Sequence, residues 1–449
     1  MSESFKSVLI WLLACLAGLS VLIFHLPSTL FDGQFIPFGG DSFYHARRIL
    51  ETIADPAEGF WEYDRRSYAP EGTWHTWPWL YDWLLAQGTR WVMAWTGVRD
   101  PLAILSYVPL AFACLNVGLF YGVARRVLSS SLLQALAVFA FALSPLTMFL
   151  HLPGRIDHHF IELTSVLATL YVGLRWLQRP SDVWAAAALG GVLGLAPGWQ
   201  NGLFVLQLPL LLTMFTAWAR GLGRPEPATV NVFCLILGGT TLAIVLPSEP
   251  FWDGQFQYYT LSAFHLLVAA YIVCALQFMS RREVGRNPVL TLVGVSVLLA
   301  AIVAPNIGLG LDFLTATTSK HDLISEMVNI ARFIHGKGLE ETLRTYSLLV
   351  IGLPVAMLVM LVWPFQRTQT DRVYFAWMAC GGGALLLLLF SAAGGGAARV
   401  VAEEMGASRG GVGGRISRRC SGGSSISSSP SLPPSPGGSR SPSASIHAS

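Results

Sequence analysis

Three short segments, far apart along the chain, carry acidic side chains, and two of them also carry histidine. They are Gly39-Gly40-Asp41-Ser42-Phe43-Tyr44-His45-Ala46-Arg47, Gly154-Arg155-Ile156-Asp157-His158-His159 and Leu323-Ile324-Ser325-Glu326. Carboxylate oxygens combined with one imidazole nitrogen suit Mn²⁺ or Mg²⁺ better than a thiol-preferring metal. The three segments therefore predict a divalent-cation site if the fold brings them together. Asp157 and His159, two positions apart, could bind the same ion if the local backbone is extended or tightly turned.

Each acidic residue also has a simpler interpretation, which the sequence alone leaves open. Asp41 could serve only as the N-cap of a helix over residues 42–52, and Asp157 could cap the helix that follows it. Glu326 could be an ordinary solvated loop residue. A common position on one side of a membrane would favour the joint interpretation as a metal site over these separate ones.

Composition excludes a soluble protein for most of the chain. Of its 449 residues, 53% are hydrophobic and only 12% are charged, whereas soluble domains carry about 25% charged residues. So few charges cannot coat a water-facing surface. The net charge is only +3, and the absence of a long basic tract predicts no nucleic-acid partner. The fold class that follows is an all-α polytopic membrane protein.

Apolar segments of about 20 residues, the length that crosses a bilayer as a helix, recur along the chain. The predicted spans cover residues 8–26, 101–123, 131–150, 160–177, 183–199, 200–219, 230–247, 262–279, 289–309, 346–363 and 373–392. This predicts a bundle of about 11 transmembrane helices. The first span lacks a cleavage site, so we expect it to be retained.

Arginine marks every second connection between these spans. Arginines follow the second, fourth, sixth and eighth spans and flank the tenth, at Arg125, Arg126, Arg175, Arg179, Arg220, Arg224, Arg281, Arg282, Arg286, Arg367 and Arg372. The positive-inside rule places these connections in the cytoplasm. The alternate connections, including a first outer loop of about 27–100 and a late outer loop of about 310–345, then face outward with all three acidic segments.

The composition changes at about residue 393. Beyond it, Gly, Ser, Pro and Arg dominate and long apolar runs are absent. Such a segment buries too little apolar surface to fold, so we predict a transmembrane domain over 1–393 and a disordered tail over 394–449. The tail also has the composition of a GC-rich coding sequence read out of frame.

The acidic segments resemble motifs in the catalytic subunit of oligosaccharyltransferase, the STT3/PglB/AglB family of GT-C glycosyltransferases. The segment 40–47 resembles the family's first acidic motif, with its Tyr-His and Arg. Asp157-His158-His159 resembles the Asp-x-His form of the second motif, and residues 323–326 resemble its Ser/Thr-x-x-Glu motif loosely. The Trp-Trp-Asp motif that the family carries in a C-terminal soluble domain is absent from the sequence.

The resemblance implies a GT-C transmembrane domain that moves a glycan from a polyprenyl (pyro)phosphate to an acceptor Asn of a polypeptide. It implies Asp41, Asp157 and Glu326 as catalytic residues, and Asp41, Asp157, His159 and Glu326 as ligands of Mn²⁺ or Mg²⁺. His321, Arg332 or the neighbouring Lys320 would assist at the donor phosphate. The partners would be the lipid-linked donor, the acceptor polypeptide and membrane lipids, at a bacterial or archaeal cell membrane with the active site facing outward.

Two other functions fit part of the same pattern. A GT-C enzyme could transfer its sugar to a lipid instead of a protein, because the Asp41 motif would serve both reactions. A transporter is less consistent with the sequence, because its charged residues would mark a pathway through the membrane. Here the charges lie at the ends of the spans, and no inverted repeat with broken helices is evident.

Overall fold

A computed structural model of the chain describes residues 3–66, 70–74, 77–207, 225–258, 260–281 and 340. These residues belong to one compact unit, Met1–Ala397. The predicted spans 289–309, 346–363 and 373–392, most of the late outer loop and the tail lie outside the described residues. The helices are α1 (Glu3–Phe24), α2 (Gly40–Ala54), α3 (Trp79–Thr96), α4 (Pro101–Val127), α5 (Ser131–Ala142), α6 (Pro145–Leu150), α7 (His159–Gln178), α8 (Val183–Trp199), α10 (Pro227–Val245), α11 (Glu249–Trp252) and α12 (Ala263–Arg281).

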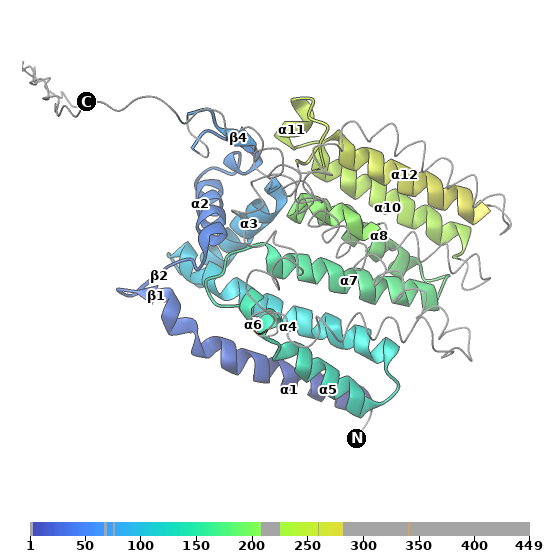
Figure 1. The fold of residues 1–449 in the computed structure, drawn as a ribbon, viewed down its shortest axis with the longest axis horizontal. Helices are drawn as coiled ribbons and strands as arrows, with labels where there is room; N and C mark the ends of the chain where they lie inside the picture. The colour runs from blue at the N-terminus through green and yellow to red at the C-terminus, as the bar shows by residue number, and fades with distance from the viewer. Residues whose placement is uncertain are drawn as a thin grey trace, which may run out of the picture. The chain divides into compact units, whose positions relative to one another are not determined.

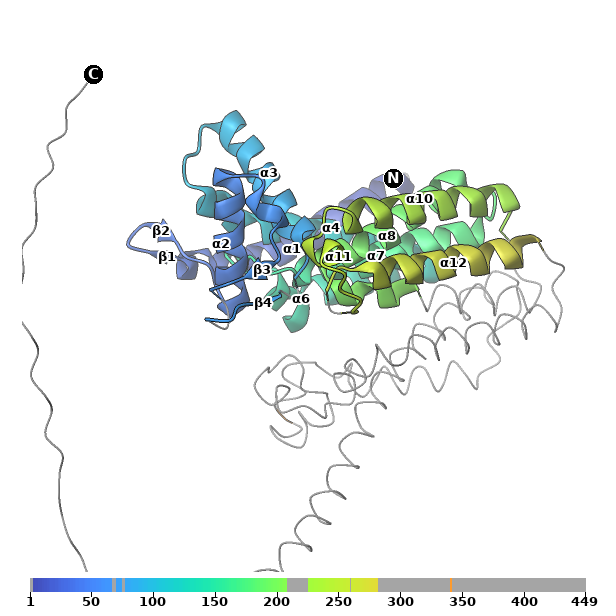
Figure 2. The same ribbon diagram turned by 90° about the horizontal axis from the view of Figure 1, so that it is seen from above.

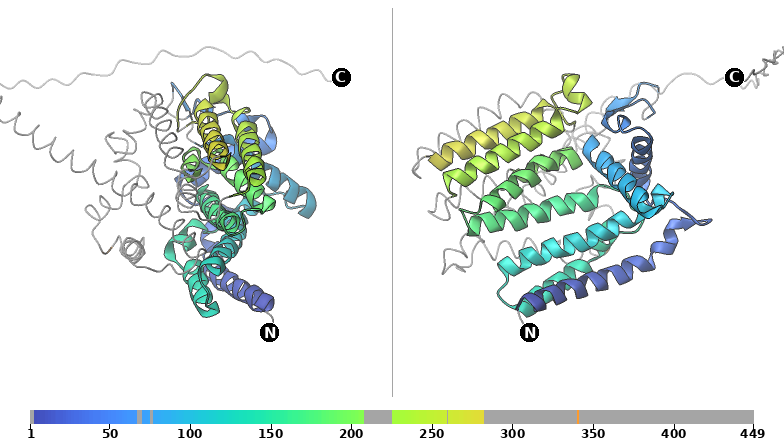
Figure 3. Two further views of the ribbon diagram at one scale, coloured as in Figure 1. Left: turned by 90° about the vertical axis from the view of Figure 1, so that its right-hand side faces the viewer. Right: turned by 180° about the vertical axis from the view of Figure 1, so that it is seen from behind.

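Helices α1, α4, α7, α8, α10 and α12 lie side by side in this order, with roughly parallel axes, and α5 lies beside α1 and α4 (Figure 1). The same order is visible from behind in the right-hand view of Figure 3. Five of these helices are long and apolar enough to cross a membrane: Phe5–Phe24, Pro101–Val127, His159–Gln178, Pro227–Val245 and Ala263–Arg281. Each coincides with a predicted span to within a few residues. The protein is therefore an all-α polytopic membrane protein, as its sequence predicts.

The predicted span 131–150 is wrong as a single helix. The chain forms α5 over Ser131–Ala142, breaks, and starts again as α6 at Pro145. Proline disfavours helical backbone in the residue before it, and Ser144 takes extended dihedral angles. Its hydroxyl oxygen accepts a hydrogen bond from the backbone N–H of Thr147 at 3.2 Å and so caps α6. Twelve residues of α5 extend only about 18 Å, too short to cross a bilayer alone.

The bundle core is apolar and is tightest between α8 and α10. Buried Leu189, Leu193, Phe233 and Leu237 from these two helices pack together in it. Gly190 lies directly against the facing helix, because a Cβ atom added there would stand 2.7 Å from the backbone oxygen of Phe233. Glycine at this position thus permits a backbone approach that any larger residue would prevent.

The segment between α1 and α4, predicted as the first outer loop, contains two helices of its own. It contains the two-stranded sheets β1 (Leu30–Phe31) with β2 (Gln34–Phe35) and β3 (Tyr63–Asp64) with β4 (Thr73–Trp74), the 3₁₀ turns η1 (Leu26–Thr29) and η2 (Glu58–Phe60), and helices α2 and α3. Seen from above, α2 and α3 lie at one end of the bundle, beside α11 (Figure 2). They cover the end at which α4 and α7 begin.

Glu62 connects this segment to Ser248, the N-cap residue of α11. Its two carboxylate oxygens accept hydrogen bonds from the backbone N–H of Trp79 at 2.9 Å and from the hydroxyl of Ser248 at 2.9 Å. The side chain is almost completely buried. Burial raises the pKa of Glu62 to about 7, although the charge of Arg48 and these hydrogen bonds oppose the increase.

We expect this carboxyl group to make stability depend on pH. A group whose pKa rises from 4.5 to about 7 on folding contributes stability that is fully present below 4.5 and is lost as the pH rises through 7. In the wild type, the thermal midpoint should therefore fall between pH 5 and 8. In Glu62→Gln, the part of this fall that comes from the titration of Glu62 should disappear. Glu58→Gln, at an exposed position, should retain the wild-type slope. Equal slopes in all three proteins would contradict the assignment to Glu62.

Candidate metal centre

The fold brings together three of the four predicted metal ligands. Asp41 lies in the first turn of α2, Asp157 in the segment before α7, and His159 is the first residue of α7. One ligand atom from each residue lies within 4.8 Å of the others. Glu326, and the predicted substrate-binding residues His321 and Arg332, lie outside the described residues.

The helix-capping interpretation is wrong for both aspartates. The N-cap of α2 is Gly39, whose φ of +97° is disfavoured for residues with a side chain, and Asp41 lies inside the first turn. The N-cap of α7 is His158, not Asp157, and its side chain makes no capping hydrogen bond. Neither aspartate is therefore the N-cap residue of its helix.

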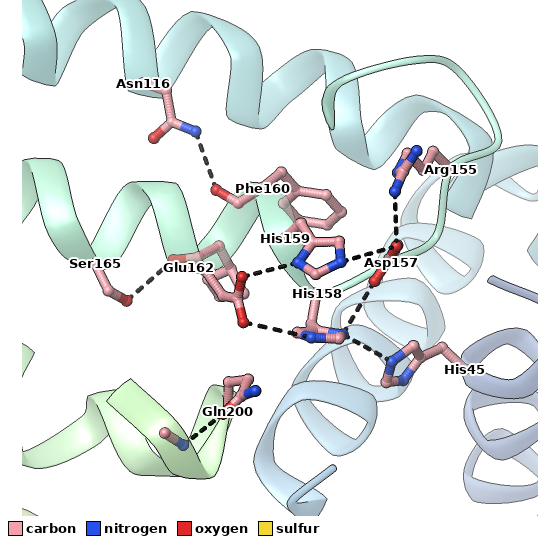
Figure 4. A network of polar contacts seen from close by, with 12 residues as sticks. His45, Asn116, Arg155, Asp157, His158, His159, Phe160, Glu162, Ser165 and Gln200 are labelled. Atoms are coloured by element: carbon pink, nitrogen blue, oxygen red, sulfur yellow. Dashed lines mark hydrogen bonds and ion pairs between the residues drawn. The ribbon is translucent and has the colours of Figure 1, made fainter. Parts of the chain in front are cut away.

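Asp157 is the centre of a buried polar cluster (Figure 4). Its Oδ2 atom lies 3.1 Å from Arg155 Nη2 and 3.6 Å from His159 Nε2, and its Oδ1 atom lies 3.0 Å from His158 Nδ1. Burial favours the neutral acid and raises the pKa of Asp157, but contact with His158 and the charges of His159 and Arg155 outweigh it and hold the pKa well below its usual range. Asp157 is thus an ionised carboxylate at neutral pH, as a metal ligand must be.

His159 has the orientation of a metal-binding histidine. Its Nδ1 atom lies 2.8 Å from Glu162 Oε2 (Figure 4), and because a carboxylate can only accept, His159 is the donor. The other ring nitrogen, Nε2, is the one that faces Asp157, at 3.6 Å from Oδ2. A carboxylate that accepts from the far ring nitrogen is the usual outer partner of a metal-binding histidine.

A second buried row of polar groups joins α2, α3 and α7. Arg48 Nε lies 3.0 Å from Asp82 Oδ2, His45 Nδ1 lies 2.7 Å from Asp82 Oδ1, and His45 Nε2 lies 3.2 Å from His158 Nδ1. Asp82 and His45 are fully buried. Asp82 was not among the residues predicted from the sequence. The sequence does contain an indication of its role, because a single acidic residue among aromatic ones, as in Trp79-Leu80-Tyr81-Asp82-Trp83, needs a buried partner.

A cavity of about 290 Å³ lies along α2, with Arg48 of the second polar row in its lining. Tyr44, Arg47 and Glu51 of α2 form one wall, and Trp61, Tyr63 and Glu249 contribute to the others. Its lining combines aromatic rings with charges of both signs, several of them paired, such as Arg47 with Asp64 and Arg66 with Glu51.

The chain is similar to archaeal oligosaccharyltransferases in sequence and in structure. No family model matches it. Two proteins of Archaeoglobus fulgidus, dolichyl-phosphooligosaccharide–protein glycotransferases 1 and 2, are 24% identical over 188 residues and 25% identical over 194 residues. These matches cover 40% and 39% of this chain, but only 30% and 31% of the two relatives.

Solved structures show the same fold over a longer stretch. The archaeal oligosaccharyltransferase AglB from A. fulgidus, in complex with an inhibitory peptide and a dolichol-phosphate, superposes with a TM-score of 0.66 at 18% identity, over 93% of this chain and 53% of that chain. An A. fulgidus oligosaccharyltransferase in complex with Zn and sulfate has a TM-score of 0.52 at 19% identity, over 87% of this chain and 51% of that one. The chain thus spans about half of the solved proteins. Over the matched region it is homologous to the AglB/STT3 oligosaccharyltransferases and has their polytopic GT-C fold.

Proposed function

We propose that this protein is a metal-dependent oligosaccharyltransferase, which moves a glycan from a polyprenyl (pyro)phosphate carrier to the side chain of an acceptor Asn. The observation that carries the proposal is the convergence of Asp41, Asp157 and His159 within 4.8 Å of one another. These residues come from motifs more than 100 positions apart, and they meet in a fold shared with enzymes named for that reaction.

The donor set fits a divalent cation. Two carboxylates and one imidazole would hold Mn²⁺ or Mg²⁺, and the low pKa of Asp157 keeps its carboxylate ionised for that purpose. When bound, the cation would neutralise charge on the leaving phosphate. A structural neighbour in complex with Zn and sulfate supports the proposed metal site. Another neighbour, in complex with an inhibitory peptide and a dolichol-phosphate, supports the proposed donor and acceptor.

The residues of the chain would prepare both substrates. An amide nitrogen is a poor nucleophile, because its lone pair is conjugated with the carbonyl group. Carboxylates that accept hydrogen bonds from it, Asp41 and Glu326 in our proposal, would weaken that conjugation. Arg155 holds Asp157 in place, through a 3.1 Å contact and a guanidinium that lies over the Phe149 ring at 3.9 Å. His321, Lys320 or Arg332 would add positive charge near the donor phosphate.

The cavity beside α2 suits the sugars of the donor. Four arginines and four carboxylates balance one another in its lining, and Arg47 pairs there with Asp64 and Arg66 with Glu51. This balance of charge favours a neutral ligand over an ion. The exposed ring of Trp61 and the rings of Tyr44 and Tyr63 offer apolar faces, and carboxylates and guanidinium groups offer hydrogen bonds. A neutral sugar has complementary C–H faces and hydroxyl groups.

We also propose that the site faces outward from a bacterial or archaeal cell membrane. Arg125 and Arg126 lie in the last turn of α4, Arg175 in that of α7 and Arg281 in that of α12. Asp41, Asp157 and His159 lie where α2 and α7 begin, so acidic and basic residues occupy opposite ends of the helices. The positive-inside rule assigns the basic end to the cytoplasm.

The test is a transfer assay with the full chain in lipid nanodiscs. A polyprenyl-linked oligosaccharide is the donor, and a fluorescent Asn-x-Thr peptide and a lipid acceptor are offered in parallel. We expect glycopeptide to form with Mn²⁺, to stop with EDTA, and to resume when Mn²⁺ is restored. Glycan on the lipid alone would show that the acceptor is a lipid, and transfer that persists in EDTA would overturn the metal dependence.

A further inference from the structure

A second group of potential metal ligands lies next to the first and shares Asp157 with it. His45 of α2, with Asp157 and His158 of the segment before α7, each offer one ligand atom within 4.8 Å of the others. His45 Nε2 and His158 Nδ1 are 3.2 Å apart, and His158 Nδ1 is 3.0 Å from Asp157 Oδ1. All three side chains are buried, with at most 3% of their surface exposed.

These separations match the spacing of ligands around a small tetrahedral ion. With metal–ligand bonds of about 2.0–2.1 Å, the ligand atoms of such an ion lie about 3.3 Å apart. Two imidazole nitrogens with one carboxylate oxygen form a donor set typical of Zn²⁺, and richer in nitrogen than Mg²⁺ or Mn²⁺ prefers.

Both histidines have a carboxylate on the far side of the ring. Asp82 Oδ1 lies 2.7 Å from His45 Nδ1 and accepts a hydrogen bond from it, and Glu162 Oε1 lies 3.4 Å from His158 Nε2. The other two ring nitrogens, His45 Nε2 and His158 Nδ1, face each other at 3.2 Å beside the Asp157 carboxylate. A cation placed between them would contact both nitrogens and the carboxylate.

An independent observation concerns Asp157 itself. Its Oδ1 atom is buried and makes no geometrically acceptable hydrogen bond with any described residue, although His158 Nδ1 lies 3.0 Å away. A buried carboxylate oxygen without a hydrogen bond is costly, and coordination to a cation would remove that cost.

We propose that His45, His158 and Asp157 Oδ1 bind a second divalent cation of the Zn²⁺ class, separate from the ion at Asp41, Asp157 Oδ2 and His159. Asp82 is its positioning residue, because it fixes the tautomer of His45 and is itself held by Arg48 at 3.0 Å. The ion would tie α2 to the start of α7. This site does not depend on the proposed glycan transfer, since it is defined by binding alone.

The experiment counts metal in the full chain, purified in nanodiscs without a histidine tag, stripped with a chelator and then loaded with Zn²⁺ alone. We expect His45→Gln to bind one equivalent fewer than wild type by elemental analysis, and Asp41→Asn to lose a different equivalent, so that the double variant loses two. His151→Gln is the matched control, because His151 is equally buried but contacts only Asn116 and the Thr147 carbonyl. Unchanged zinc content in His45→Gln would show that a proton occupies the position and would overturn the proposal.

A second measurement, the visible absorption of bound Co²⁺, tests the site in a variant that keeps all three proposed ligands. Co²⁺ replacing Zn²⁺ at this site should produce the intense visible absorption of a four-coordinate ion. Asp82→Asn, which retains all three ligands, should lower the affinity for Co²⁺, measured by titration at that absorption band, by about 10–100-fold. Absence of the band in wild type, or an unchanged affinity in Asp82→Asn, would contradict the proposal even if the His45 variant fails to fold.

Discussion

Asp157→Asn is expected to lower the rate of glycan transfer by about three orders of magnitude while the protein still folds. The substitution keeps the volume of the side chain but removes the charge that both metal ligation and the contact with Arg155 require. Stabilisation by a metal ion is worth several kcal/mol, and each 1.36 kcal/mol corresponds to a tenfold change in rate. Single-turnover transfer to the Asn-x-Thr peptide at saturating donor measures the effect.

Asp182→Asn is the matched control for this variant. Asp182 accepts a hydrogen bond from the backbone N–H of Ala185 at 3.0 Å and pairs with Arg175 at 2.8 Å. This pair lies between the end of α7 and the start of α8, at the other end of α7 from the candidate site. Asparagine also caps helices well, so transfer should remain close to wild type. If Asp157→Asn kept even a tenth of wild-type activity, Asp157 would not be a ligand that the reaction requires.

Asp82→Leu is expected to reduce the free energy of unfolding by about 3–5 kcal/mol. Asp82 is fully buried and contacts both Arg48 and His45. Without it, the Arg48 guanidinium stays buried, and the partners it keeps among the described residues are the hydroxyl of Tyr44, the carbonyl of Gly59 and the more weakly interacting carboxyl group of Glu62. A charge buried without its counter-ion is the costly case. The thermal midpoint in detergent, followed by the fluorescence of the surrounding tryptophans, measures the loss.

The double variant Arg48→Met/Asp82→Leu separates the charge from the packing. It removes both members of the pair, so much of the stability lost in Asp82→Leu should return. The charge-neutral Asp82→Asn should be less destabilised than Asp82→Leu, because its amide oxygen can still accept from Arg48 or His45. A double variant as unstable as Asp82→Leu would show that the shape of the side chain, and not its charge, supports α3.

The membrane spans could be predicted from the sequence because the bilayer imposes a length and a polarity that are visible in the residues themselves. The predicted span 183–199 coincides with α8, and 101–123 lies within α4. The break between α5 and α6 was equally visible as Ser144-Pro145. Our prediction gave it too little weight, because the hydrophobicity of residues 131–150 continues across the proline.

The candidate site was only partly predictable for a different reason. Asp41, Asp157 and His159 are recognisable within short motifs, and the structure brings their ligand atoms together. Asp82 and the contact between His45 and His158 depend on how α3 packs between α2 and α7. No local spacing specifies such a packing, so these residues could not be assigned before the fold was known.

Helix α2 carries residues of both the cation cluster and the cavity. Asp41 occupies its first turn, and Arg47 and Glu51 reach the cavity wall about 9–15 Å further along the same axis. If α2 tilted as one body, its cavity residues and Asp41 would therefore move together relative to Asp157, which belongs to a different segment. The cavity and the proposed cation site thus share one structural support.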